Sequence, residues 1–159
     1  MPTIVLDDGT LLNEGCATLQ YIADQNPGTI APAPGSKERY TTINDLNYVA
    51  TEVHKDAFSK TFHPAFKQEG AVRDFILSNF DAKMNYLNDV RIAGKEFLSG
   101  TAPTIADYYL YIVLGWCQYN GTDLSKYPHC FSYHARMHQR PEVGGAWARM
   151  MTAPTTTIA

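Results

Sequence analysis

The chain has 159 residues, the size of a single domain or of one domain with part of another. Its composition (45% hydrophobic, 12% aromatic and 18% charged) is that of a globular protein and excludes disorder, a collagen-like repeat and a coiled coil. Thirteen basic and sixteen acidic side chains give a formal net charge of -3. This near balance argues against nucleic acid or an anionic membrane surface as a partner.

The sequence carries no evident signal for export or membrane insertion. No segment approaches the roughly 20 apolar residues that span a bilayer, and the longest candidate, residues 105–117, contains Asp107. The N-terminus lacks a basic region followed by an apolar stretch. The three cysteines (Cys16, Cys117 and Cys130) are odd in number and have no Cys-x-x-Cys spacing. We therefore expect a reduced, cytoplasmic protein with no membrane partner.

The first residues predict a β-hairpin followed by a helix. Residues 3–6 and 10–12 are β-branched and apolar, and Asp7-Asp8-Gly9 between them is typical of a hairpin turn. Two strands alone are marginal in water, so the hairpin must pack against another element. A helical pattern starts at Glu14 and stops at Asn26-Pro27-Gly28. Residues 26–36 hold three prolines and two glycines, which indicates a linker.

Everything after the linker is predicted to be helical. Apolar residues recur every three to four positions from Tyr40 to Ala57, and again from Val72 to Val90. The run from Thr104 to Trp116 is apolar nearly all round, which predicts a central buried helix. Two shorter helices follow, around residues 131–139 and from Pro141, whose ring suits a first helical position. The fold class is therefore mainly α.

The start of the central helix has the strongest local signal. Thr104 places a hydroxyl at the N-cap, and Asp107 stands three residues on, with Asp in the usual Glu or Gln position of a capping box. Such a cap contributes about 1 kcal/mol. We assign Thr104 and Asp107 a structural rather than a catalytic role.

Several short motifs occur together in the order typical of one family. Residues 6–15 (LDDGTLLNEG) and 20–24 (QYIAD) resemble the second half of the thioredoxin-like domain of glutathione transferases. Further motifs resemble the all-helical domain of the bacterial beta class, at residues 38–40, 46–48, 52–55, 104–107 and 139–143. The resemblance covers Pro2 to about Ala148. It implies a transferase C-terminal helical domain at 37–151, preceded by a truncated thioredoxin-like remnant (hairpin plus helix) at 1–27 and a linker at 28–36, with a frayed tail at 152–159.

The resemblance also implies a departure from the family pattern. In the family, a βαβ unit precedes the cis-proline and carries the Cys, Ser or Tyr that contacts the thiol of glutathione, whereas this sequence begins one residue before the matching Pro2. The chain is then either a naturally shortened member or a fragment. An uncovered strand edge is seldom tolerated, so we expect a homodimer in which a partner chain, the tail or the ligand covers it.

The resemblance implies glutathione as cofactor, bound by residues near the hairpin. Met1 and Pro2 would pair with its cysteinyl unit in antiparallel fashion, unless the terminus frays. Glu14 and Gly15 precede a helix, where free N–H groups and the dipole favour an anion. By resemblance this pair receives the γ-glutamyl group; the alternative is a plain acidic helix start. Asn47 would reach the γ-glutamyl group bound in a partner subunit.

The catalytic candidates are His54 and Lys55, on the first long helix. Asn47 and His54 are seven residues apart and so share a face of an α-helix, with Lys55 one position round. By resemblance, His54 and Lys55 lie near the thiol and the glycine end of glutathione. A cation near a thiol lowers its pKa, and the thiolate is the nucleophile. The alternative is a solvated or packed side chain.

Four aromatic residues are candidates for an apolar substrate pocket. Tyr109 and Trp116 are seven residues apart on the central helix, and Phe58 and Phe62 could meet them from the first long helix. Aromatic stripes usually belong to a core. By resemblance, however, Tyr109 and Trp116 stand beside the pocket that takes the second, apolar substrate.

Three other residues have a possible chemical role that the pattern does not favour. Cys16 follows Gly15 at a helix start, where its pKa could be depressed, but a packed thiol is the better interpretation. His134 and His138 have i,i+4 spacing but lack a third metal ligand, so a solvated helix face is favoured and no metal site is predicted.

The resemblance implies a glutathione-dependent transferase or isomerase. The glutathione thiolate would add to an activated alkene of an apolar, electrophilic small molecule. The adduct would leave as a conjugate or, after rotation about the former double bond, be expelled as an isomer, in a biosynthetic pathway. The alternative is a non-catalytic glutathione-binding or protein-interaction module.

Overall fold

Residues 3–152 are described by the computed structural model of the chain. Met1 and Pro2, two of the expected glutathione contacts, and residues 153–159 of the expected tail lie outside this range. The helices and strands are β1 (Ile4–Val5), β2 (Leu11–Leu12), α1 (Gly15–Asp24), α2 (Lys37–Tyr48), η1 (Val49–Phe58), α3 (Ser59–Thr61), η2 (Pro64–Lys67), α4 (Ala71–Tyr86), η3 (Leu87–Ile92), α5 (Ile105–Gly115), α6 (Cys117–Asn120), η4 (Leu124–Lys126), α7 (Pro128–His138) and α8 (Pro141–Thr152).

The two strands form the expected hairpin, although each is only two residues long. They pair antiparallel with Ile4 opposite Leu12 and Val5 opposite Leu11. The turn is closed by the Gly9 N–H, which donates to the Leu6 carbonyl at 2.9 Å, and Gly9 itself has a φ of 84°. An L side chain rarely adopts this angle, which explains the glycine. The hairpin leads directly into α1.

The first long helix is one continuous rod that changes its winding. The chain passes from α2 through η1 into α3 without leaving helical dihedral angles, and η1 is a π-helix of 10 residues. Ser36 caps the start, because its hydroxyl accepts a hydrogen bond from the Arg39 N–H at 3.1 Å. A second π segment, η3, ends the other long helix, α4. Hydrophobic periodicity alone predicted the rod but not its π winding.

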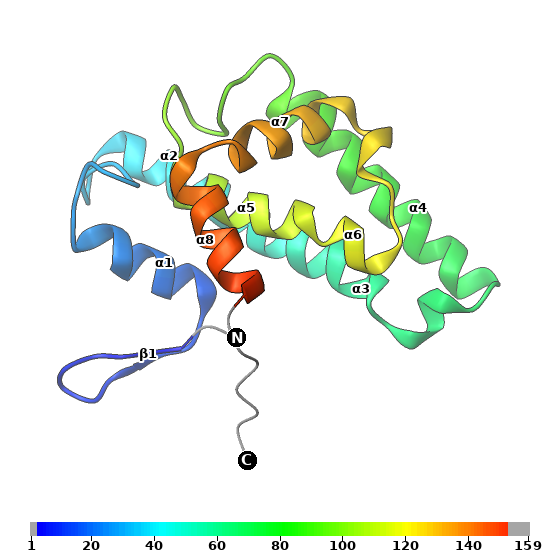
Figure 1. Cartoon of the computed structure of the whole chain (residues 1–159), viewed down its shortest axis with the longest axis horizontal. Coiled ribbons are helices and arrows are strands. Elements are labelled where there is room, and N and C mark those ends of the chain that lie inside the picture. The colour runs from blue at the N-terminus through cyan, green and yellow to red at the C-terminus, as the bar shows by residue number, and fades with distance from the viewer. Residues whose placement is uncertain (1–2, 153–159) are drawn as a thin grey trace.

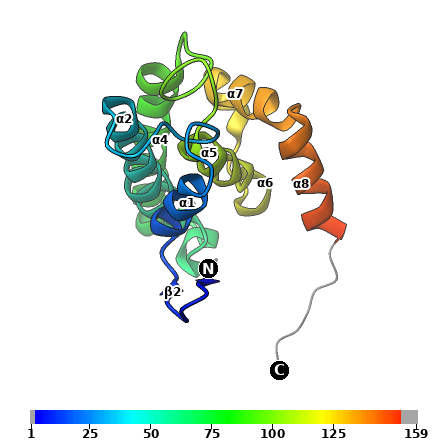
Figure 2. The ribbon, with the colours of Figure 1, turned by 90° about the vertical axis from the view of Figure 1, so that its left-hand side faces the viewer.

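Helix α5 runs through the middle of the bundle, as its apolar sequence predicts. It packs against α1, α2, η1 and α7. In Figure 1 it crosses the centre of the molecule, with the hairpin and α1 near one end. Figure 2 looks along the bundle and shows α2 and α4 on one side of α5 and α7 and α8 on the other. The side chains of Ile105, Leu110 and Leu114 are fully buried.

The predicted capping box at the start of α5 is present and extends further than a local cap. The Asp107 carboxylate accepts hydrogen bonds from the Thr104 N–H at 2.8 Å and the Thr104 hydroxyl at 2.9 Å. It also accepts from the Leu98 N–H at 2.9 Å and the Tyr133 hydroxyl at 2.5 Å. Asp107 is completely buried, so it joins α5, α7 and the loop before α5.

Not every apolar residue of the periodic pattern faces the core. On α4 and η3, Ile76, Phe80 and Met84 are buried, whereas Phe75 is 67% exposed. Val72 and Val90 are also exposed. The pattern therefore located the helix but overestimated the width of its buried face. Among residues 3–152, no helix is long and apolar enough to cross a membrane.

Candidate functional site

An aromatic cluster surrounds His54 where η1 faces α5. The His54 Nδ1 atom lies 2.5 Å from the Tyr109 hydroxyl, within hydrogen-bond distance. The rings of His54 and Trp116 meet edge to face, with centroids 4.8 Å apart. The structure thus brings together a catalytic candidate and two pocket candidates that are far apart in the sequence.

The two phenylalanines play different parts in this cluster. Phe58 is fully buried between Phe80, at 5.0 Å between ring centroids, and Trp116, at 6.3 Å. Phe62 is 46% exposed and its ring lies 5.8 Å from that of Trp116. Phe62 therefore exposes part of its ring, whereas Phe58, expected to line the pocket, is fully buried and packs against Trp116.

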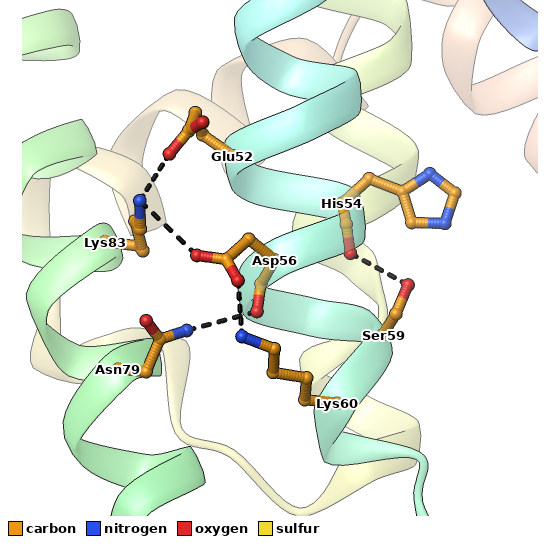
Figure 3. Close-up of polar contacts among 7 residues, drawn as sticks. All are labelled: Glu52, His54, Asp56, Ser59, Lys60, Asn79 and Lys83. Atoms are coloured by element: carbon orange, nitrogen blue, oxygen red, sulfur yellow. Dashed lines mark hydrogen bonds and ion pairs between the residues drawn. The ribbon is translucent and has the colours of Figure 1, made fainter.

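The opposite side of η1 is anchored to α4 by charged residues. Figure 3 shows Glu52 and Asp56 meeting Lys83 of α4, with His54 pointing away from them. The Lys83 ammonium pairs with Glu52 and lies 3.4 Å from the Asp56 carboxylate, which also pairs with Lys60. Hydrogen bonds from Lys60 and then Lys83 lower the pKa of Asp56, and hydrogen bonds to Glu52 and then Asp56 raise the pKa of Lys83. These ion pairs join η1 to α4 on the side of η1 that His54 points away from.

Two side chains bond to carbonyl groups of the π segment itself. The Ser59 hydroxyl donates to the His54 carbonyl at 3.0 Å, and the Asn79 amide donates to the Asp56 carbonyl at 3.1 Å (Figure 3). π segments inside helices occur frequently at functional sites. The backbone that carries His54 is therefore held by side-chain contacts as well as by its own winding.

Near neutral pH, both members of the His54–Tyr109 pair are uncharged. Burial, and then the positive charge of Lys55, lower the pKa of His54 below its ordinary value. Burial raises the pKa of Tyr109, and the nearby Cys16 and Glu14 raise it further. His54 is thus a neutral imidazole rather than the cation that sequence reasoning allowed. Lys55, which is exposed, carries the positive charge.

Helix α1 packs against α5, and Glu14 at the start of α1 contributes to the raised pKa of Tyr109. Glu14 is the N-cap residue, with extended backbone, and its exposed side chain makes no capping hydrogen bond. Gly15 opens the helix, and a Cβ there would meet nothing within 4 Å. Cys16 is half-buried, and burial followed by Glu14 raises its pKa. The thiol is therefore packed, in agreement with its favoured interpretation.

Asn47, expected to share a helix face with His54, lies in α2, before the π segment that carries His54. It is exposed near the end of α2, and its side chain makes no hydrogen bond within residues 3–152. The seven-residue spacing from His54 was taken as two α-helical turns. The intervening residues are largely in the π segment η1, where each residue advances by a smaller angle, so that spacing no longer closes two turns.

The interpretation of His134 and His138 as a solvated helix face was wrong for His134. Its ring stacks on Tyr111 of α5, with centroids 4.7 Å apart and an interplanar angle of 13°. Its Nε2 atom is buried without a hydrogen-bond partner, and burial lowers its pKa to about 4. His138 is exposed, yet its Nδ1 lies 2.7 Å from the Tyr111 hydroxyl. Across the described part of the chain, no group of three or more His, Cys, Asp or Glu could hold a metal ion.

Comparison with known proteins connects this geometry to a family. Residues 53–145 match the family described as "Glutathione S-transferase, C-terminal domain". Glutathione S-transferase GstA of Escherichia coli O157:H7 is 39% identical over 147 residues, which are 92% of this chain and 71% of that protein.

Solved structures of glutathione S-transferases are also similar to this chain. A sphingomonad glutathione S-transferase complexed with glutathione is similar with a TM-score of 0.85 and 38% identity, over 96% of this chain and 75% of that one. The bacterial beta class glutathione S-transferase of Sphingomonas chungbukensis is similar with a TM-score of 0.82 and 36% identity, over 93% of this chain and 72% of that one.

The helical bundle, with a hairpin and α1 before it, is thus the helical domain of a transferase preceded by part of a thioredoxin-like domain. The chain belongs to the glutathione S-transferase family. Its motifs had indicated this family and its bacterial beta class, and glutathione is the family's co-substrate.

Proposed function

We propose that the chain is a glutathione-dependent transferase that adds the glutathione thiolate to an apolar, conjugated electrophile, with release as conjugate or as double-bond isomer. The observation that carries this proposal is the hydrogen-bonded His54–Tyr109 pair, set among aromatic rings and near the start of α1. In this assignment residues 1–27 are the thioredoxin-like part, 28–36 the linker and 37–151 the helical domain.

The start of α1 is the proposed subsite for the γ-glutamyl group. The first N–H groups of a helix have no partner within the helix, and the helix dipole favours an anion there. Gly15 is the first residue of α1 and can offer its N–H to the γ-glutamyl carboxylate. The Glu14 carboxylate makes no capping bond and can pair with the ammonium. Met1 and Pro2 stay proposed partners of the cysteinyl unit.

His54 is the proposed hydrogen-bond donor to the thiolate. Tyr109 keeps its proton, because its pKa is raised, and can donate it to Nδ1 of His54. A neutral imidazole whose Nδ1 accepts a hydrogen bond carries its own proton on Nε2. That N–H can then donate to sulfur, while the exposed Lys55 ammonium adds a favourable potential. Both effects favour the thiolate over the thiol.

The second substrate would lie against the rings of Phe62 and Trp116, with Tyr109 beside them. These side chains offer flat apolar surface next to the proposed sulfur position. The thiolate attacks the β-carbon of an activated alkene, forming the S–C bond while the π electrons move to the α-carbon and its carbonyl. Protonation of this enolate gives the conjugate. Rotation about the new single bond, followed by loss of the thiolate, gives the trans isomer and regenerates glutathione.

Dimethyl maleate tests both outcomes in one assay, because addition gives the glutathione adduct and expulsion gives dimethyl fumarate. NMR of the mixture measures the two products with and without protein. We expect His54→Gln to reduce turnover about tenfold or more, the effect of losing a donor to a developing charge. His129→Gln, an exposed histidine on α7, is the matched control and should keep full activity. Turnover equal to the uncatalysed rate would contradict the transferase proposal.

A homodimer is part of the proposal, with Asn47 reaching toward the glutathione of the partner subunit. The exposed side chain of Asn47, which makes no hydrogen bond within residues 3–152, supports this role. Two measurements on Asn47→Ala test this role. Light scattering should show that the variant remains dimeric, and calorimetric titration should show that it binds glutathione more weakly.

A non-catalytic glutathione-binding or protein-interaction module is the alternative, and glutathione binding without any dimethyl maleate turnover would favour it.

A further inference from the structure

A pocket lies on the side of α5 that faces α7 and α8. It has a volume of about 490 Å³ and is lined by residues of α5, α6 and α7, the segment around η4, and Trp147 of α8. This volume is within the range of small-molecule sites, which are about 300–1,000 Å³. In the function proposed above, glutathione and the electrophile lie at the His54 cluster and do not occupy this pocket.

One wall of the pocket is formed by packed aromatic rings. Tyr111 is buried, stacks on His134 and bonds to His138 through its hydroxyl. Trp147 meets Tyr111 edge to face, with ring centroids 6.1 Å apart. A flat ring inserted beside this wall would find aromatic partners already in place.

A polar atom without a partner stands at the inner wall. The Nε2 of His134 makes no hydrogen bond and is shielded from solvent. It faces Gly115, the last residue of α5, where an added Cβ would lie 3.4 Å from Nε2 and 3.9 Å from the Trp147 ring. The missing side chain therefore leaves space between the unpaired nitrogen and the tryptophan. Buried polar groups are almost always bonded, so this nitrogen suits a ligand that supplies the missing partner.

The charges around the pocket disfavour an anionic ligand. Among the described residues, neither lysine nor arginine lines it. Asp123 lies at its rim, and hydrogen bonds from Ser125 lower the pKa of that carboxyl, so it is ionised and repels anions. His134 is uncharged at neutral pH. We propose that this pocket binds a flat, neutral aromatic molecule that carries one hydroxyl group, with the ring beside Tyr111 and Trp147 and the hydroxyl bonded to His134 Nε2.

Calorimetric titration of 2-naphthol into the full chain tests this assignment. We expect saturable binding, and about tenfold weaker binding for naphthalene, which lacks the hydroxyl. His134→Phe should weaken 2-naphthol to the level of naphthalene and leave naphthalene unchanged. The anion 2-naphthoate should bind more weakly than 2-naphthol.

Gly115→Ala is the sharpest variant, because it fills the space beside Nε2 with one methyl group. Alanine favours a helix over glycine, and the added Cβ makes ordinary contacts, so the variant should fold at least as well as the parent. We expect it to weaken 2-naphthol at least tenfold. Phe62→Ala, at the surface proposed for the electrophile, is the matched control and should leave 2-naphthol binding unchanged.

Three results would overturn the assignment. Unchanged 2-naphthol affinity in Gly115→Ala would show that the pocket is not the site. Loss of affinity in Phe62→Ala would move the ligand to the His54 cluster. Equal affinity for 2-naphthoate would refute the selection for a neutral ligand.

Discussion

Replacing Asp107 by asparagine should destabilise the fold far more than its conservative size suggests. One carboxylate oxygen accepts from the Leu98 N–H and the Tyr133 hydroxyl, and the other from the N–H and hydroxyl of Thr104. An amide has a single oxygen. In either orientation, the asparagine therefore satisfies one pair of donors and turns its NH₂ toward the other.

The cost follows from the count of lost bonds. A hydrogen bond to a charged group contributes about 1.5–3 kcal/mol, and a buried donor left unpaired carries its full desolvation penalty. In each pair the hydroxyl can turn to accept from the NH₂, so the backbone N–H is the donor that loses its acceptor, and the remaining bonds lose their charged partner. At a site with no solvent exposure, these losses amount to about 3 kcal/mol. That is a large fraction of the 5–15 kcal/mol typical of a domain.

Urea unfolding followed by far-ultraviolet circular dichroism measures this difference in the free energy of unfolding. Asp74→Asn, at an exposed position in the first turn of α4, is the matched control and should cost about 0.5 kcal/mol. Equal losses in the two variants would refute the view that Asp107 joins three elements of the core.

Other predictions concern charge. Lys55→Met should raise the pKa of His54 toward its ordinary value in an NMR titration, because a neighbouring cation lowers it; an unchanged pKa would contradict the proximity. Between pH 6.5 and about 4, the unfolded His134 takes up a proton that the folded one does not. The free energy of unfolding should therefore decrease as the pH is lowered from 6.5 to about 4. The decrease is at most about 3 kcal/mol, and less for a ring with partial solvent access. His134→Phe should make the free energy of unfolding less dependent on pH in this range. Lys83→Met should cost less than about 1 kcal/mol in thermal unfolding, since its ion pairs are partly exposed; a cost above about 2 kcal/mol would show a buried role.

Features that depend on neighbouring residues were predictable from the sequence. The turn at Asp7-Asp8-Gly9 and the capping box at Thr104 each lie within four residues, and the chemistry of those residues determines the local backbone. The burial of α5 was equally predictable, because a helix that is apolar on all sides has no face to offer to water.

Features that depend on distant partners were not predictable. The start of α7 is capped from η3, where the Asn88 amide oxygen accepts from the N–H groups of His129 and Cys130 at 2.9 and 3.1 Å. The burial of His134 depends on Tyr111, which lies on another helix. Likewise, η1 packs against α4, from which the Asn79 amide donates to the Asp56 carbonyl of the π segment. No spacing within the sequence signals any of these arrangements.

At the candidate site, the sequence motifs indicated which residues lie close together, but not the protonation of His54 or the burial of Phe58. His54, Tyr109 and Trp116 do meet, and Phe62 joins them at the surface. The neutrality of His54 and the complete burial of Phe58 follow from packing density, which a list of residue types does not contain.

Titration of reduced glutathione into the purified chain by calorimetry most directly tests whether the start of α1 holds this tripeptide. We predict saturable binding with one site per chain, strongly weakened by Glu14→Ala and unchanged by Glu38→Ala, an equally exposed acidic residue at the start of α2. Heats no larger than dilution, or equal binding by both variants, would contradict it.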